Sequence, residues 1–340
     1  RQSSICVAII CLILLFKAGI AFVLTDSKST GPIAKENGVT QQEIAEAQDK
    51  KPGKVVQSVT FQTNVDREQK KDATVLESPH HDDQKVLQWR KNAVAVQNTN
   101  DRPRIAIVID DIGLKKANSK AVMQLDGPLT LALLPYADKL EQQAESARQN
   151  GHELLVHMPM QPRSTDINPG PNVLRADLKR QELEKRLARA LSAFQGYVGI
   201  NNHMGSRFTA NGKAMDKLMS NLADRGLLFL DSLTTPDSVG ARAAARNNVP
   251  FAARHVFLDH VAKPENIRRA LKKVERIARE RGHAIAIGHP KDPTIKALKQ
   301  WMPKARERGF QFVPISAIVQ RGHKTVHMRK TQVLREAAVQ

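Results

Sequence analysis

The sequence predicts an α/β fold, a closed or nearly closed barrel of parallel strands with helices on the outside. From Arg104 onward, short apolar segments typical of strands alternate with helical segments seven or eight times over roughly 215 residues. Strands that are this short and this numerous favour a barrel over an open doubly wound sheet. Glycine follows five of the helical segments, as expected for helix C-caps, at Gly151, Gly196, Gly226, Gly282 and Gly309.

The individual elements follow from the spacing of apolar residues. Short apolar runs predict strands at 104–110, 129–134, 154–157, 198–201, 227–231, 256–259, 284–288 and 310–315. Apolar residues at three- and four-residue spacing predict helices at 137–149, 180–194, 213–225, 265–281 and 294–308. The first strand is not followed by Gly-x-Gly-x-x-Gly, so the sequence gives no support for dinucleotide binding.

The N-terminal segment, residues 1–24, is predicted to be a signal peptide or an uncleaved anchor. It is apolar from Ile5 to Leu24 apart from Lys17, and small residues occupy 18–21. Both readings predict an exported, periplasmic or envelope-associated protein. Cys6 and Cys11 lie in this segment and are the only cysteines in the sequence, so the remainder has no thiol for a disulfide, a nucleophile or a metal ligand.

Residues 25–101 are predicted to be a disordered polar linker, residues 102–320 the folded domain and residues 321–340 a basic tail. The linker is too polar to bury enough apolar surface to offset chain entropy. Residues 1–100 carry a net charge of +2, whereas the rest carries +17, so the domain should be attracted to anionic polymers or lipid headgroups. Nucleic acid is not expected as a partner, because the protein is predicted to be exported and only 4% of its residues are aromatic. Membrane contact is expected only through an uncleaved N-terminal segment.

The most informative segment is Ile105 to Gly113, where a buried strand ends in the adjacent carboxylates Asp110 and Asp111. Catalytic groups collect at the carboxyl ends of strands in α/β proteins. One of two neighbouring carboxylates can bind a cation while the other moves a proton. The alternative is a helix N-cap beside a solvated neighbour.

Other predicted strands also end in polar residues. They are His157 on the third strand, Asn201, Asn202 and His203 on the fourth, Asp231 and Ser232 on the fifth, Asp259 and His260 on the sixth, and His289 on the seventh. A single histidine at a strand end is more often part of a hydrogen-bonded core than a ligand. One aspartate with two histidines is nevertheless a suitable ligand set for Zn²⁺ acting as a Lewis acid. With Asp110 as base and His289 as acid, such a set would hydrolyse a carbonyl compound.

Three motifs in this order resemble those of the polysaccharide deacetylase superfamily: Val108-Ile-Asp-Asp-Ile-Gly113, Gly151-His-Glu-x3-His157 and Ile285-Ala-Ile-Gly-His289. Longer strings beginning at His157, Asn201 and Phe229 resemble its divergent branch. The resemblance covers about residues 102–320. It implies a distorted (β/α)7-type barrel, a divalent metal ion and removal of acetyl groups from carbohydrate.

The resemblance also implies roles for individual residues. Asp110 matches the catalytic base, Asp111 a metal-binding carboxylate, His157 a metal-binding histidine and His289 the general acid. Gln161 stands where the family has its second metal-binding histidine, and we expect His203 to supply the third ligand because of its placement. The family's arginine motif is not recognisable, although Arg207 lies nearby. Asp231 is expected to orient a histidine.

Three hypotheses about function follow. The first is a zinc-preferring deacetylase that acts on a carbohydrate polymer of the cell envelope. The second is a catalytically weak or inactive barrel that serves as an envelope binding or scaffold protein, which Gln161 and the scarcity of aromatic residues favour. The third is a metal-dependent hydrolase of another ester, amide or phosphoester.

Overall fold

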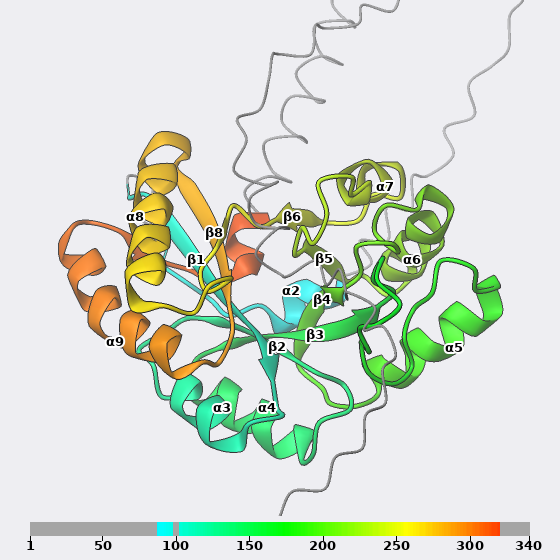
Figure 1. Ribbon diagram of the computed structural model, residues 1–340, viewed down its shortest axis with the longest axis horizontal. Coiled ribbons are helices and arrows are strands. Elements are labelled where there is room, and N and C mark those ends of the chain that lie inside the picture. The colour runs from blue at the N-terminus through cyan, green and yellow to red at the C-terminus, as the bar shows by residue number, and fades with distance from the viewer. Residues whose placement is uncertain (1–86, 98–101, 320–340) are drawn as a thin grey trace, which may run out of the picture.

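The computed structural model describes residues 87–97 and 102–319 and shows a distorted β/α barrel, as predicted (Figure 1). All strand pairs in its sheet are parallel, and neighbouring strands follow the order β6-β5-β4-β3-β2-β1-β8-β7, with β9 added beside β1. The strands span Arg104–Ile112 (β1), Thr130–Leu133 (β2), Glu153–Met160 (β3), Tyr197–Met204 (β4), Leu228–Asp231 (β5), Phe251–Ala253 (β6), Val256–Phe257 (β7), His283–Gly288 (β8) and Gln311–Phe312 (β9). The order begins at β6 and ends at β7, so the barrel is open between these two short strands.

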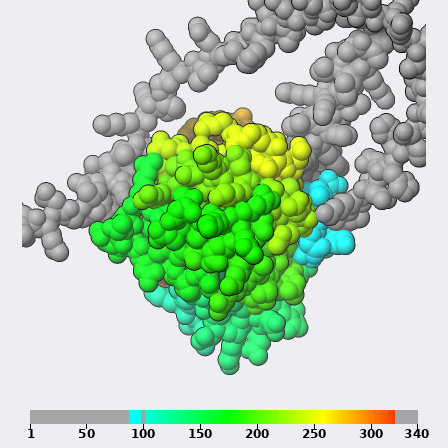
Figure 2. All heavy atoms as spheres, turned by 90° about the vertical axis from the view of Figure 1, so that its right-hand side faces the viewer, coloured from blue at the N-terminus to red at the C-terminus, as the bar shows by residue number. Residues whose placement is uncertain are grey.

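Helices cover the outside of the sheet (Figure 1). They are α3 (Lys116–Met123), α4 (Leu140–Gln149), α5 (Arg180–Leu191), α6 (Gly212–Asp224), α7 (Gly240–Arg246), α8 (Pro264–Arg281) and α9 (Asp292–Glu307). Helix α2 (Gln88–Asn92) lies instead near the middle of the barrel (Figure 1). Figure 2 shows the face on the side of α5 and α6, where the middle of the chain forms a closely packed outer surface. The larger apolar core lies between strands and helices, and a second cluster that includes Val108, Leu155 and Ile287 fills the inside of the barrel.

Strand β1 holds the centre of the sheet because it is apolar on both faces. Residues Ile105 to Ile109 are buried, and the strand pairs with β2 on one side and β8 on the other. Burial on both faces explains the continuous apolar run, which is typical of parallel sheets. The carboxyl ends of β1, β3, β4 and β8 therefore meet at one rim of the barrel.

Among the strands and helices named above, four were not predicted from the sequence. Strand β6 and helix α7 are three and seven residues long, too short to show a clear periodicity. Helix α3 has only Val122 and Met123 as large buried apolar residues. Helix α2 falls inside the predicted linker.

Residues 87–97 pack against the barrel, because six of these eleven residues are apolar although the segment lies within a polar stretch of the sequence. Trp89 is buried among apolar residues of the inner cluster, and its backbone N–H donates to Gly226 O at 3.0 Å. Leu87, Ala93 and Val96 pack against the same cluster, so Trp89 and these three flanking residues together bury the apolar surface that docks the five-residue helix. The N-terminal segment 1–24, the linker up to residue 86 and the tail 321–340 lie outside the described residues. In the described ranges, no helix is long and apolar enough to cross a bilayer.

Glu153, at the start of β3, is predicted to give the fold a pH-dependent stability. Burial raises the pKa of its carboxyl to about 7, although Ser316 and Thr130 donate hydrogen bonds to it. The folded chain therefore binds more protons than the unfolded chain at mildly acidic pH, and stability falls as pH rises from the unfolded pKa of 4.5 to about 7. In the wild type, the free energy of unfolding should fall by on the order of 3 kcal/mol over this pH range because of Glu153. We expect Glu153→Gln to abolish this fall, as measured by denaturant unfolding at about pH 5 and about pH 8.

The matched control is Glu141→Gln, which changes an exposed carboxylate on α4. This variant should keep the wild-type dependence of stability on pH. If Glu153→Gln shows the same dependence of stability on pH as the wild type, Glu153 is not its cause.

Candidate active site

The first two residues of the site, Asp110 and Asp111, face the same pocket because β1 is irregular at its end. In a regular strand, neighbouring side chains point to opposite faces. Here the pairing with β2 shifts register between Ile109 and Ile112, and Asp111 has a left-handed backbone with φ of 57°. As a result, His157 Nε2 lies 3.7 Å from Asp110 Oδ2 and 3.3 Å from Asp111 Oδ1.

Asp111, His157 and His203 place three ligand atoms in a small triangle. His203 Nδ1 lies 3.1 Å from Asp111 Oδ1 and 3.1 Å from His157 Nε2. Ligand atoms around a tetrahedral zinc with bonds of about 2.0–2.1 Å lie roughly 3.3 Å apart. The spacing of these three atoms therefore suits a single small divalent cation.

The hydrogen bonds of His157 show which of its ring nitrogens can bind a metal. Asn201 Nδ2 donates to Asp110 Oδ1 at 2.7 Å, so Asn201 Oδ1 is the acceptor for His157 Nδ1–H at 2.9 Å. With the proton on Nδ1, the lone pair of Nε2 points at the triangle. Asp111 Oδ1 is buried and has no well-aligned hydrogen bond. With Nε2 deprotonated, its lone pair and the carboxylate oxygen face each other at 3.3 Å, which is the arrangement that a cation satisfies.

The electrostatics of the pocket also favour a positive charge at this point. Burial by itself lowers the pKa of His157, but the carboxylates of Asp110 and Asp111 outweigh burial and raise that pKa to about 9. Burial by itself raises the pKa of Asp111, but the contacts with His157 and His203 hold it well below its usual range. Asp110 differs, because burial dominates and raises its pKa. The two adjacent carboxylates are therefore distinct: Asp111 is held ionised and Asp110 has the greater affinity for a proton.

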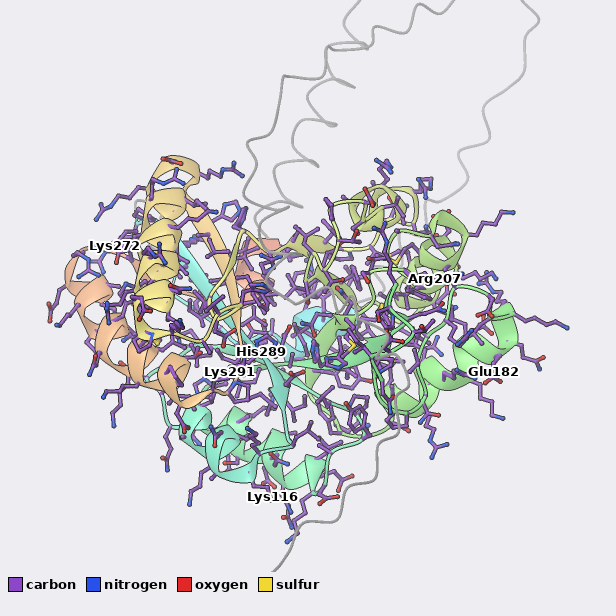
Figure 3. All side chains as sticks on the ribbon, in the orientation of Figure 1. Lys116, Glu182, Arg207, Lys272, His289 and Lys291 are labelled. Atoms are coloured by element: carbon purple, nitrogen blue, oxygen red, sulfur yellow. The ribbon has the colours of Figure 1, made fainter. Side chains whose placement is uncertain are left out.

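His289 enters the pocket from the end of β8 and is held by Asp259. Its Nδ1 lies 2.9 Å from Asp259 Oδ1, and its backbone N–H donates to Asp259 Oδ2 at 2.8 Å. Thr294 Oγ1 donates to the same carboxylate, which is buried. Burial lowers the pKa of His289, but Asp259, Asp111 and Asp110 together raise it above its usual value. His289 Nε2 faces the ligand triangle, 3.8 Å from Asp111 Oδ2, and Figure 3 shows the residue in the middle of the molecule.

The structure thus brings together Asp110, Asp111, His157, His203 and His289, all of which the sequence singled out. The orienting role expected of Asp231 is not seen, because that carboxylate accepts from Ser238 Oγ and Leu233 N. Asp259 and Asn201 orient the histidines instead. The sequence shows Asp259 and Asn201 as polar residues at strand ends. It does not show which strands lie side by side, and this order decides which polar residue contacts which histidine.

Gln161 lies outside the ligand triangle. Its side-chain Oε1 accepts from Ala176 N at 3.0 Å, and its backbone oxygen accepts from Arg207 N and Phe208 N at 3.1 Å. Gln161 therefore ties the loop after β3 to the loop after β4. His203, from β4, occupies the third corner of the triangle, as its placement suggested.

Arg207 is an exposed residue of the loop after β4, on the opposite side of His289 from α8 (Figure 3). The charge of Asp110 acts on a different cation, Arg254. The guanidinium of Arg254 donates to Ser232 O at 2.8 Å and Leu233 O at 2.9 Å, and the charge of Asp110 counteracts the lowering of the Arg254 pKa by burial.

This geometry agrees with the comparison with known proteins. Residues 107–319 match the pattern of the divergent polysaccharide deacetylase family, and these residues include the whole site. The chain belongs to this family.

Two curated proteins and one solved structure are also similar to the chain. It is 37% identical to YibQ of Escherichia coli K12 over 197 residues, which are 58% of this chain and 61% of YibQ. It is 34% identical to a protein of Haemophilus influenzae over 196 residues, 58% of this chain and 70% of that protein. The chain is also similar to the crystal structure of ATU2773 from Agrobacterium tumefaciens C58, with 31% identity and a TM-score of 0.66. The match covers 68% of this chain and 94% of the ATU2773 chain. The chain thus spans about three fifths of the length of YibQ.

Proposed function

We propose that this member of the divergent polysaccharide deacetylase family is a divalent-metal-dependent hydrolase that removes acetyl groups from a carbohydrate polymer of the cell envelope. The observation that carries the proposal is the triangle of Asp111 Oδ1, His157 Nε2 and His203 Nδ1, with mutual distances of 3.1–3.3 Å. Family membership supports the class of reaction.

Asp111, His157 and His203 would hold the metal ion, and their mixed oxygen and nitrogen donors suit zinc. When bound, the ion supplies Lewis-acid polarisation of an acetyl carbonyl and of the attacking water. Asn201 supports the ligand set, because it fixes the proton on His157 Nδ1.

Asp110 and His289 would divide the proton transfers. Asp110 is not in the triangle, and its raised pKa suits a general base that takes a proton from the attacking water. His289 is held at Nδ1 by Asp259, which leaves Nε2 to donate a proton to the leaving amine or alkoxide. The two groups approach the triangle from different strands, β1 and β8, so they can act on opposite sides of one acetyl group.

The cell-envelope location and the polymer are part of the proposal. The apolar segment at 1–24 supports export, and the net charge of +17 from residue 101 onward supports an anionic partner such as an acidic polysaccharide. Nucleic acid remains an unexpected partner for an exported chain with few aromatic residues.

The deciding experiment is metal analysis of the purified full chain together with its His203→Ala variant. We expect about one zinc-like ion per wild-type chain and loss of most of it in the variant, because one corner of the triangle is gone. The matched control is Gln161→Ala, at the position where the resemblance to the polysaccharide deacetylase superfamily leads one to expect a second metal-binding histidine. This variant should keep its metal, since Gln161 bonds to Ala176.

Two outcomes would redirect the proposal. If neither zinc, manganese, nickel nor cobalt binds the wild type, the metal-dependent mechanism is wrong and the envelope binding or scaffold protein replaces it. If metal binds and acetylated polymers release no acetate, the chain is a hydrolase of another ester, amide or phosphoester, or an inactive barrel.

A further inference from the structure

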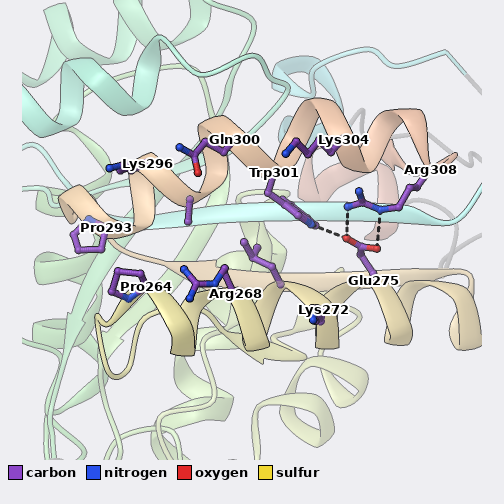
Figure 4. Close-up of a pocket in the computed structure, with 12 residues that line it drawn as sticks. Pro264, Arg268, Lys272, Glu275, Pro293, Lys296, Gln300, Trp301, Lys304 and Arg308 are labelled. Atoms are coloured by element: carbon purple, nitrogen blue, oxygen red, sulfur yellow. Dashed lines mark hydrogen bonds and ion pairs between the residues drawn. The ribbon is translucent and has the colours of Figure 1, made fainter.

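A second feature lies away from the site, in a groove between helices α8 and α9 (Figure 4). The cavity has a volume of about 590 Å³. We call it the α8–α9 groove; it is lined by Pro264, Arg268, Leu271, Lys272, Glu275, Pro293, Lys296, Ala297, Gln300, Trp301, Lys304 and Arg308. It lies on the outside of the barrel and contains none of the residues proposed for catalysis.

The groove has cationic edges. Five lysines and arginines line it, against one carboxylate, Glu275. Glu275 is already occupied, because Arg308 donates to both of its oxygens and Trp301 Nε1 donates to Oε1 at 2.7 Å (Figure 4).

The other four cations, Arg268, Lys272, Lys296 and Lys304, are exposed and form no ion pair among the described residues. Elsewhere on the surface, arginines are commonly paired with carboxylates, as Arg180 is with Glu184 and Arg246 with Asp216. The groove therefore concentrates unpaired positive charge.

The shape and floor of the groove indicate what can fill it. From Pro293 to Arg308 along α9 it is roughly 20 Å long, at 1.5 Å per helical residue. Leu271, Ala297 and the ring of Trp301 give it an apolar floor between the charged edges. A long and narrow groove of this kind fits a segment of polypeptide better than a compact small molecule.

We propose that the α8–α9 groove binds an acidic amphipathic helix of a partner protein. Apolar side chains of that helix would lie on Leu271 and Trp301, and its carboxylates would pair with Lys272 on one edge and Lys304 on the other. A lipid surface fits less well because the groove is concave. A sugar chain also fits less well, because the charged lining offers mainly donors and the Trp301 indole N–H is already bonded to Glu275.

The test uses the full chain and a labelled synthetic helical peptide of about 18 residues, with leucines along one face and glutamates along the others. Fluorescence anisotropy should show saturable binding. A scrambled peptide of the same composition, without an apolar face, should bind about tenfold more weakly, since it cannot use the apolar floor. The double variant Lys272→Glu with Lys304→Glu should also weaken binding about tenfold or more.

The matched control is Lys185→Glu with Lys213→Glu, which makes the same change in net charge with two exposed lysines near α5 and α6. It should bind the peptide as the wild type does. Equal weakening by both double variants, equal binding of both peptides, or no saturable binding would overturn the proposal. Vesicles of phosphatidylglycerol or an acidic polysaccharide that bind more tightly than the peptide, and lose binding on Lys272→Glu with Lys304→Glu, would assign the groove to that ligand instead. None of these readouts depends on catalysis, so this proposal and the proposed hydrolase can fail separately.

Discussion

Replacing Asp110 by Asn is expected to lower kcat for acetate release by about 10²–10⁴-fold while the metal content stays unchanged. The substitution keeps the shape of the side chain and an oxygen that can accept from Asn201 Nδ2. It removes the group that takes the proton from water. Because Asp110 is outside the ligand triangle, the metal should remain on Asp111, His157 and His203. Metal analysis and steady-state acetate release on the same preparation measure both quantities.

Two further variants make this result specific. Asp111→Asn removes a negatively charged ligand and should lose both metal and activity. Asp231→Asn changes another buried carboxylate at a strand end, whose partners are Ser238 and Leu233, and should keep the metal and most of the activity per folded molecule. If Asp110→Asn also loses the metal, the two neighbouring carboxylates do not divide their roles as proposed.

The contrast between Asp110 and Asp111 shows how much of the site could be predicted from the sequence. The sequence predicted that both lie at the end of a buried strand. Because parallel strands end at one rim of a barrel, it also predicted that His157, His203 and His289 lie close to them. It could not show that β1 shifts register before Ile112, which turns both carboxylates into the same pocket. The roles of Asn201 and Asp259 also required the fold. Each is one polar strand end among several, and only the order of strands shows which histidine it meets.

The fold was also predictable only in part, because only its long elements show a clear pattern of apolar residues. Long elements such as β1 and α8 have enough apolar residues to reveal their period. Short ones do not: β6 has three residues, and α2 is anchored by Trp89 alone among its own residues. In such elements, burial against the rest of the chain decides the conformation, so the local pattern carries little information.

Replacing His289 by Gln is the second change with a large expected effect. The variant lacks the acid that protonates the leaving group, so kcat should fall by about 10²–10⁴-fold for an acetamido sugar, whose amine leaves poorly without a proton. For nitrophenyl acetate the leaving group is already a stable anion, and the loss should be much smaller. A general acid predicts this difference between substrates, whereas a residue that only supports the fold predicts the same loss for both.

Asp259 tests the same mechanism through its effect on His289. Asp259→Asn should reduce activity less than His289→Gln, with the same preference for the substrate with the better leaving group, because Asp259 only holds the ring and supports its positive charge. Thr294→Val removes one hydrogen bond to Asp259 and should have the smallest effect of the three. Equal losses on both substrates in His289→Gln would argue against its role as the acid. The opposite result is a loss of activity that decreases from His289→Gln to Asp259→Asn to Thr294→Val and is larger for the acetamido sugar than for nitrophenyl acetate. It would show that the contacts from Thr294 through Asp259 position His289 to donate the proton to the leaving group.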